Sequence, residues 1–156
     1  MKSINYRGGV VEFRIPTTWK EEYSDTDGGT FYEDRPDAPT FRLKIITARS
    51  HSDITRDSAA QVVNSFKQVQ GRGERQPNGN ALARYEESGV DRDHKIRIFY
   101  WIVCNPVPPK TVRIATFSYT ILQSQESDAR IVQEIELLDR EIRAAEFSTE
   151  LGVTPK

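Results

Sequence analysis

KIRIFYWIVC, residues 95–104, is the stretch that decides the fold, because alternate residues of a β-strand point to opposite faces of the sheet. One face is apolar throughout and carries Ile96, Ile98, Tyr100, Ile102 and Cys104. The other is charged at one end and aromatic at the other, with Lys95, Arg97, Phe99, Trp101 and Val103. The apolar face requires a covering layer, which we expect to be a helix.

The second face of this strand allows two interpretations. The other helix or the N-terminal strands could cover Phe99 and Trp101, since strands buried on both faces are common in layered folds. Alternatively, these two side chains, with Arg97 and Arg84 nearby, could form a surface for a partner or a second copy, because interface centres favour aromatic residues beside arginine. Burial is the interpretation that we favour for Trp101 itself.

The surrounding sequence predicts further strands with short connections. They span about 11–15, 19–23, 30–32, 40–48, 80–88 and 111–122. A hairpin connection is expected over residues 88–93, and the proline-rich residues 105–110 should not lie inside a strand. Short connections join antiparallel neighbours, because parallel pairing needs a crossover of a dozen residues or more.

Two segments have the periodicity of amphipathic helices. The first begins with capping-box spacing at Ser58 and should end near Gly71. The second covers about 126–146, where the apolar residues Ile131, Ile135, Leu138 and Ile142 share one face. The chain is therefore predicted to be α+β, a mainly antiparallel sheet with two main helices packed on it.

The 156 residues correspond to a single domain. We expect an ordered core from about residue 5 to 147 and a frayed tail over 148–156. The loop 71–80 is expected to be mobile because of its glycine and polar content.

Two short motifs resemble the PsbP-like fold, which a photosystem II extrinsic subunit, a eukaryotic Ran-binding factor and many small bacterial proteins share. Residues 11–19, VEFRIPTTW, are similar to the opening strand, proline, turn and tryptophan of that group. Residues 28–32, GGTFY, followed by the strand 40–45, also fit its pattern. The resemblance implies a domain that binds other proteins, and it transfers no catalytic residue.

Nucleophilic and metal chemistry find little support in the sequence. Cys104 lies ten residues from His94 on one strand, about 33 Å apart at the usual rise per residue, and nothing directs His51 toward it. Residues 91–94 and 51–53 offer carboxylates and histidine without zinc spacing. We therefore expect no metal or other cofactor and no enzymatic activity, and we interpret Cys104 as a packed core residue.

Charge patterning points to a protein partner more than to nucleic acid. The net charge is −1, and the basic residues are spread along the chain, so nucleic-acid binding is not expected. Residues 20–37 contain seven acidic residues, among them Glu33, Asp34 and Asp37, but only two basic ones. This acidic stretch is either a solvated loop or a docking patch for a basic partner.

The sequence thus predicts a non-enzymatic, cytoplasmic domain that binds another protein as an adaptor, chaperone or immunity-type factor. A homodimer is an allowed arrangement, and membrane insertion is not expected, since no apolar run reaches the length of a span. The candidate binding residues are Arg84, Arg97, Phe99, Trp101, Glu33, Asp34 and Asp37. The alternative is a small-molecule binding module with a pocket between the sheet and a helix.

Overall fold

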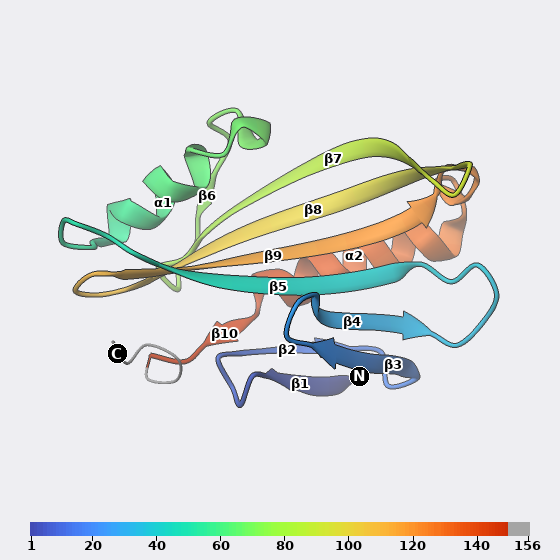
Figure 1. Ribbon diagram of the computed structural model, residues 1–156, viewed down its shortest axis with the longest axis horizontal. Helices are drawn as coiled ribbons and strands as arrows, with labels where there is room; N and C mark the ends of the chain where they lie inside the picture. Colours follow the sequence, from blue (N-terminus) through green and yellow to red (C-terminus); the bar gives the residue numbers. More distant parts are fainter. Residues whose placement is uncertain (150–156) are drawn as a thin grey trace.

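The computed structural model describes residues 1–149, and within them seven strands form one antiparallel sheet (Figure 1). Their order across the sheet is β3 (Trp19–Ser24), β4 (Gly28–Glu33), β5 (Thr40–Arg49), β9 (Thr111–Leu122), β8 (His94–Val107), β7 (Ala81–Asp91) and β6 (Glu74–Arg75). With two helices packed on this sheet, the predicted α+β class and the antiparallel pairing are confirmed.

A smaller sheet brings the two ends of the described chain together. Its strands are β1 (Lys2–Tyr6), β2 (Val11–Ile15) and β10 (Glu146–Phe147), with β2 in the middle. The sequence indicated β2 but neither β1 nor β10. β2 alternates strictly between buried and exposed residues, so one face of this small sheet is free to pack on the large one.

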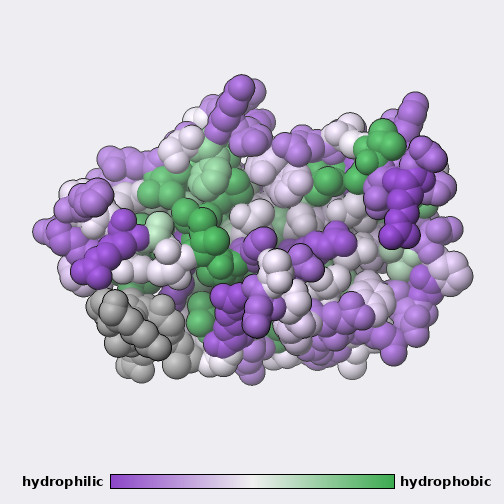
Figure 2. All heavy atoms as spheres, in the orientation of Figure 1, coloured by the Kyte–Doolittle hydropathy of each residue, from purple (hydrophilic) through white to green (hydrophobic). Residues whose placement is uncertain are grey.

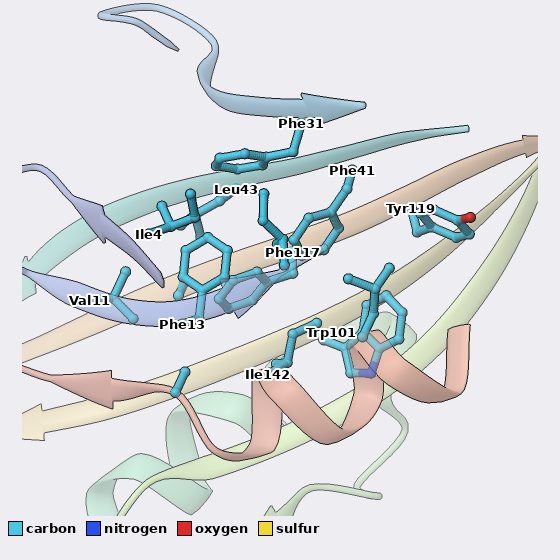
Figure 3. Packing of buried hydrophobic residues seen from close by; sticks show 14 of the residues in the cluster. Ile4, Val11, Phe13, Phe31, Phe41, Leu43, Trp101, Phe117, Tyr119 and Ile142 are labelled. Carbon is cyan, nitrogen blue, oxygen red and sulfur yellow. The ribbon is translucent and has the colours of Figure 1, made fainter. Parts of the chain in front are cut away.

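The main core lies between the two sheets and α2 (Ala129–Arg143). Figure 3 shows Phe13 of β2 pointing toward the aromatic side chains of the large sheet, and its ring packs edge-on against Phe31 and Phe117. Phe41 stacks on Phe117 with ring centroids 5.8 Å apart. At the other end of this core, α2 contributes the buried residues Ile131, Leu138 and Ile142.

The first helix, α1 (Arg56–Asn64), is shorter than predicted and begins earlier. Its N-cap is Thr55, whose backbone N–H donates to the hydroxyl of Ser58 at 2.8 Å, so Ser58 is the third helical residue and its prediction as the cap was wrong. The helix ends at Asn64, and a 3₁₀ turn over Lys67–Val69 replaces its predicted last turns. Residue Gln70 then takes a left-handed conformation, with φ of 54°.

Two strand boundaries also differ from the prediction. β8 continues through Pro106, which pairs with Val112 of β9. The pairing of β7 with β8 ends at Cys104, so proline's missing N–H falls where β8 has a neighbour on one side only. At the other end, β7 and β8 meet at a two-residue turn, Arg92–Asp93, in which both φ angles are positive.

The loop 71–80, expected to be mobile, contains the short strand β6 and a turn over residues 76–79. The frayed tail predicted for 148–156 lies mostly outside the described residues.

α2 begins at residue 129, where the Asp128 carboxylate accepts a hydrogen bond from the backbone N–H of Arg130 at 2.9 Å, and a 3₁₀ turn over Gln123–Gln125 precedes it.

Candidate functional site: the open face of the large sheet

The two faces of the large sheet are covered to different extents. The inner face is closed by the small sheet and α2, which lies behind the strands in Figure 1. Among residues 1–149, the outer face is covered only by α1 and its 3₁₀ extension, which pack on one end through Ala59, Val63 and Val69. A nine-residue helix is about 14 Å long, whereas the 14 residues of β8 span about 46 Å. Much of the outer face is therefore open, and the prediction of a helix over the whole apolar face of residues 96–104 was wrong.

A row of four paired residues crosses the middle of this open face. Arg42 of β5 pairs with Ser118 of β9, Ser118 with Tyr100 of β8, and Tyr100 with Tyr85 of β7. Paired residues of neighbouring strands project from the same face, so these side chains stand side by side. The row brings together residues from positions 42 to 118, and we call it the central row.

A groove of about 690 Å³ includes Arg42 and Ser118 of the central row and is lined by strand residues and by Phe66, which follows α1. Phe66, Ile46 and Ile114 supply apolar lining, and Thr30, Thr116 and Ser118 supply hydroxyl groups. Figure 2 views the protein in the orientation of Figure 1 and shows hydrophobic side chains gathered near α1, with paler, more polar residues beyond them. The surface thus changes from apolar to hydroxyl-rich along the sheet.

Four charged side chains line the groove, and they differ in whether another residue of the protein bonds to them. Glu22 accepts a hydrogen bond from the Tyr32 hydroxyl at 2.9 Å. Arg42 and Lys44, both exposed, form no ion pair or side-chain hydrogen bond with any of residues 1–149. Asp27 stands at the turn between β3 and β4. Two cations at the centre of the sheet are therefore available to a ligand.

Two tyrosines form an aromatic platform at the far end of the central row. The Tyr85 and Tyr100 rings are stacked, with centroids 4.7 Å apart and planes inclined by 16°. Partial burial raises the pKa of Tyr85 to about 12 and also raises the pKa of Tyr100, in each case with nearby negative charge as a further contribution. Both hydroxyls stay neutral at physiological pH, so the pair offers an uncharged aromatic surface.

The predicted aromatic site lies on the opposite face and is covered. Trp101 is fully buried beneath α2, so it cannot contact a partner, and the burial interpretation describes it. Phe99 is half-buried and packs against the same core. Arg84 is exposed at the edge of this region, with its guanidinium 5.3 Å from the centre of the Trp101 ring and 3.3 Å from Asp139.

Arg97 lies away from Trp101 and is already paired. It donates to Glu86 at 2.6 Å and lies 3.8 Å from Glu126. The structure therefore does not assemble the four residues of the predicted aromatic site into one exposed patch. Arg84 is exposed but paired with Asp139, and Arg97 is paired with Glu86. Trp101 and Phe99 belong to or pack against the core.

Several residues of the acidic stretch have partners within the chain. Glu33 pairs with both Arg35 and Arg130, and these hydrogen bonds and charges hold the pKa of its carboxyl below the usual value. Asp34 lies 3.7 Å from Lys20. Asp37 is exposed, with a positive φ of 57°. Docking of a basic partner on this stretch remains a prediction, with Asp34 and Asp37 as its freer carboxylates.

Cys104 occupies the buried position predicted for it. Its side chain packs under α1, and burial raises the pKa of the thiol to about 12. β8 runs without interruption from His94 past Cys104, so the two stand at opposite ends of the strand, and His51 is exposed beyond β5. Residues 1–149 contain no cluster of three histidine, cysteine or acidic side chains arranged to hold a metal ion.

The sequence did not identify the residues of the open face, because the alternation along a strand does not show which face of the sheet stays uncovered. The alternation over residues 40–48 did indicate that Arg42 and Lys44 share a side. Their neighbours Ser118, Tyr100 and Tyr85 become recognisable only when the register of three strand pairs is known.

Comparison with known proteins shows the fold alone. No protein-family model matches the chain, and no curated protein matches it in sequence. Among solved structures, LpqN, which is involved in cell envelope biogenesis of Mycobacterium tuberculosis, is similar with a TM-score of 0.60 and 12% identity over 88% of this chain and 83% of its own. A Bacteroides thetaiotaomicron protein is similar with a TM-score of 0.62 and 15% identity over 99% of this chain and 51% of its own.

A variant of the protein Mog1 is similar with a TM-score of 0.54 and 12% identity over 94% of this chain and 95% of its own. The chain thus has the fold of the PsbP-like/Mog1 group, as the resemblance of residues 11–19 and 28–32 predicted. Within the described residues, no helix has the length and apolar character needed to cross a membrane.

Proposed function

We propose that this chain is a non-catalytic binding domain that holds a partner protein on the open face of its large sheet. The observation that carries the proposal is the incomplete cover of that face, because α1 reaches only one end of β8. An exposed sheet surface of this kind is large, rigid and supported from behind by the main core, which suits recognition of another folded chain.

The composition of the open face also supports a binding role. Its aromatic platform of Tyr85 and Tyr100 and the guanidinium of Arg42 are residue types that interface centres favour. The chemistry-bearing side chains do not gather there: Cys104 is buried beneath α1, and neither His51 nor His94 lines the groove. The hydroxyls of the groove therefore have no histidine beside them that could activate them as nucleophiles, which favours binding over catalysis.

Site-specific photocrosslinking in the source cells tests the proposal. A benzoylphenylalanine at Ser118, in the central row, should give one defined crosslinked protein. The same residue at Val132, which is 42% exposed on α2, is the matched control. The partner, identified by mass spectrometry and purified, should then bind the wild-type chain more tightly than a Ser118→Tyr variant. Equal crosslinking from both positions, or equal affinity for both chains, would show that the open face is not the binding surface.

A small-molecule binding module is the second candidate, and the size of the groove favours it. Its volume of about 690 Å³ lies within the range of about 300–1,000 Å³ that is typical of ligand pockets. A compound that raises the melting temperature and loses this effect when Thr116→Trp fills the groove would support this alternative. A partner that binds the Thr116→Trp and wild-type chains equally well would also show that the groove itself is not the docking surface.

A cytoplasmic location and self-association are further parts of the proposal that need direct tests. The single cysteine cannot form a disulfide within the chain, which suits a reducing compartment. The similar protein LpqN acts in envelope biogenesis, so fractionation of the source cells should decide between the two compartments. Analytical ultracentrifugation would reveal a homodimer, and a dimer that Ser118→Tyr disrupts would identify a second copy as the occupant of the open face.

A further inference from the structure

The charges on the open face follow a pattern that depends on strand position. The cations Arg42 and Lys44 stand on β5, near the centre of the sheet, and alternate along one strand about 7 Å apart. Acidic residues stand nearer the two sides, with Glu22 and Asp27 toward β3 and Glu87 on β7. Lys20 also stands on this face of β3, where it lies 3.7 Å from Asp34. The face therefore carries two cations without an ion-pair partner among the described residues near its middle, with acidic side chains toward both sides.

We propose that the partner segment on this face presents one carboxylate, or two adjacent ones, to Arg42 and Lys44, with an aromatic or aliphatic side chain beside it on the Tyr85–Tyr100 platform. This inference rests on the proposed function and specifies the chemistry of the partner. The two cations are exposed and have no ion-pair partner among residues 1–149, so the protein itself does not neutralise them.

Neighbouring groups can complete the carboxylate site. Thr116 of β9 pairs with Lys44, and Ser118 pairs with Arg42, so a hydroxyl stands beside each cation. A carboxylate has about four lone-pair directions, more than one guanidinium or ammonium group satisfies. The hydroxyls and the two cations together offer it donors from two adjacent strands.

The acidic borders limit the partner to a short acidic motif. A long polyacidic segment would bring further carboxylates toward Glu22 and Asp27 on one side or Glu87 on the other, where like charges repel. The apolar part of the segment must also lie toward β7 and β8, because the stacked tyrosines stand there. Charge and aromatic position together orient the segment from β5 toward β7.

Titration of isotope-labelled protein with synthetic peptides, followed by NMR, tests this inference without the natural partner. The probe is the capped peptide Gly-Ser-Glu-Glu-Phe-Phe-Ser-Gly. Its controls replace both glutamates with glutamine, or extend them to six glutamates. We expect the probe to shift the backbone resonances of Arg42, Lys44, Ser118 and Tyr100, and to bind at least tenfold more tightly than either control.

Two double variants that remove the same charge at different places test whether Arg42 and Lys44 bind the probe. The double variant Arg42→Gln/Lys44→Gln should weaken binding of the probe at least tenfold. The double variant Arg92→Gln/Lys95→Gln removes the same charge from the β7–β8 hairpin, where both residues are exposed, and should leave binding unchanged. Both should keep the wild-type melting temperature, because none of the four side chains forms an ion pair among the described residues.

Three results would overturn the inference. These are binding of the glutamine peptide as tight as that of the probe, an equal loss in both double variants, and shifts that sodium acetate alone reproduces at the same concentration. The proposed function is tested separately by crosslinking from Ser118. A crosslinked partner whose affinity is insensitive to Arg42→Gln/Lys44→Gln would leave the open face as the binding surface and refute the acidic motif.

Discussion

The indole N–H of Trp101 donates a hydrogen bond of 2.9 Å to the carboxylate of Asp139, across the contact between β8 and α2. Figure 3 shows the Trp101 side chain beside this helix. Asp139 also pairs with Arg84 of β7 at 3.3 Å and accepts from Arg143 one helical turn later at 3.0 Å. Arg143 in turn donates to Glu74 of β6 at 2.8 Å. The Asp139 carboxylate thus connects α2 to two strands of the large sheet, and Arg143 beside it connects the helix to a third.

Replacing Trp101 with alanine should lower the free energy of unfolding by about 3–5 kcal/mol, the usual cost of a large cavity where an aromatic side chain was buried. The fully buried position of Trp101 is the reason for this expectation. Guanidinium denaturation measures it, with Val132→Ala on the exposed side of α2 as the control. Equal stability of the two variants would be incompatible with Trp101 lying in the core.

Replacing Asp139 with alanine should lower the free energy of unfolding by about 1–3 kcal/mol, because the buried indole N–H then loses its acceptor. The control is Glu136→Ala, an exposed position on the same helix. Trp101→Phe, which has no N–H, should make Asp139→Ala less costly. A double-mutant cycle with simply additive effects would contradict this coupling.

The Cys104 thiol should be almost inert in the folded protein. Its pKa of about 12 leaves little thiolate at pH 8, and the side chain is buried beneath α1. Reaction with Ellman's reagent should therefore be slow in buffer and fast in 6 M guanidinium chloride. Similar rates in the two solutions would show that the α1 layer opens readily.

Stability should fall as the pH rises above 10. Tyr85 and Tyr119 have pKa values raised above that of an exposed tyrosine, mainly by burial, so above pH 10 the unfolded chain releases protons that the folded chain retains. The contribution of these two tyrosines to the free energy of unfolding is fully present below pH 10. It is lost as the pH approaches their pKa values in the folded protein, which is about 12 for Tyr85. Melting temperatures measured from pH 8 to pH 12 check the direction, and Tyr85→Phe should flatten the decline.

The acidic stretch can be tested without disturbing the fold. Asp34→Ser/Asp37→Asn should keep the melting temperature, because the first carboxylate has only a 3.7 Å ion pair and the second is exposed, while asparagine tolerates the positive φ of residue 37. Glu33 should be left in place, since it joins β4 to α2 through Arg130. If a basic partner docks here, stopped-flow mixing with that partner should show slower association and a weaker salt dependence. Unchanged rates would leave the stretch as a solvated loop.

How much of the fold was predictable depended on how local each signal is. The alternation of Val11, Phe13 and Ile15 and the apolar spacing of α2 are read within one element, and both predictions were confirmed. β10 has only two residues and is defined by its pairing with β2, far away in the sequence. No local pattern could indicate it.

The candidate site was less accessible to sequence reasoning for a related physical reason. Trp101 and Tyr100 are consecutive, and both could belong to a core or to a surface. Which of them is covered depends on where each helix docks and how far it reaches, and α1 ends at Asn64, before its apolar pattern does. The sequence therefore directed attention to the face that α2 closes, whereas the partly buried pair Tyr85 and Tyr100 lies on the other face.

The small sheet has a consequence for how this chain acquires its structure. β2 pairs with β10, and Arg14 of β2 makes a bidentate ion pair with Glu141 of α2, a sequence separation of 127 residues. Contacts of this length close very large loops, and folding slows as the average sequence separation of native contacts grows. On the ribosome, β1 and β2 are synthesised long before their partners in α2 and β10. Phe13 of β2 can meet Phe31 of β4 early, but the pairing of β2 with β10 and the ion pair of Arg14 with Glu141 must wait until residues 141–147 have been made.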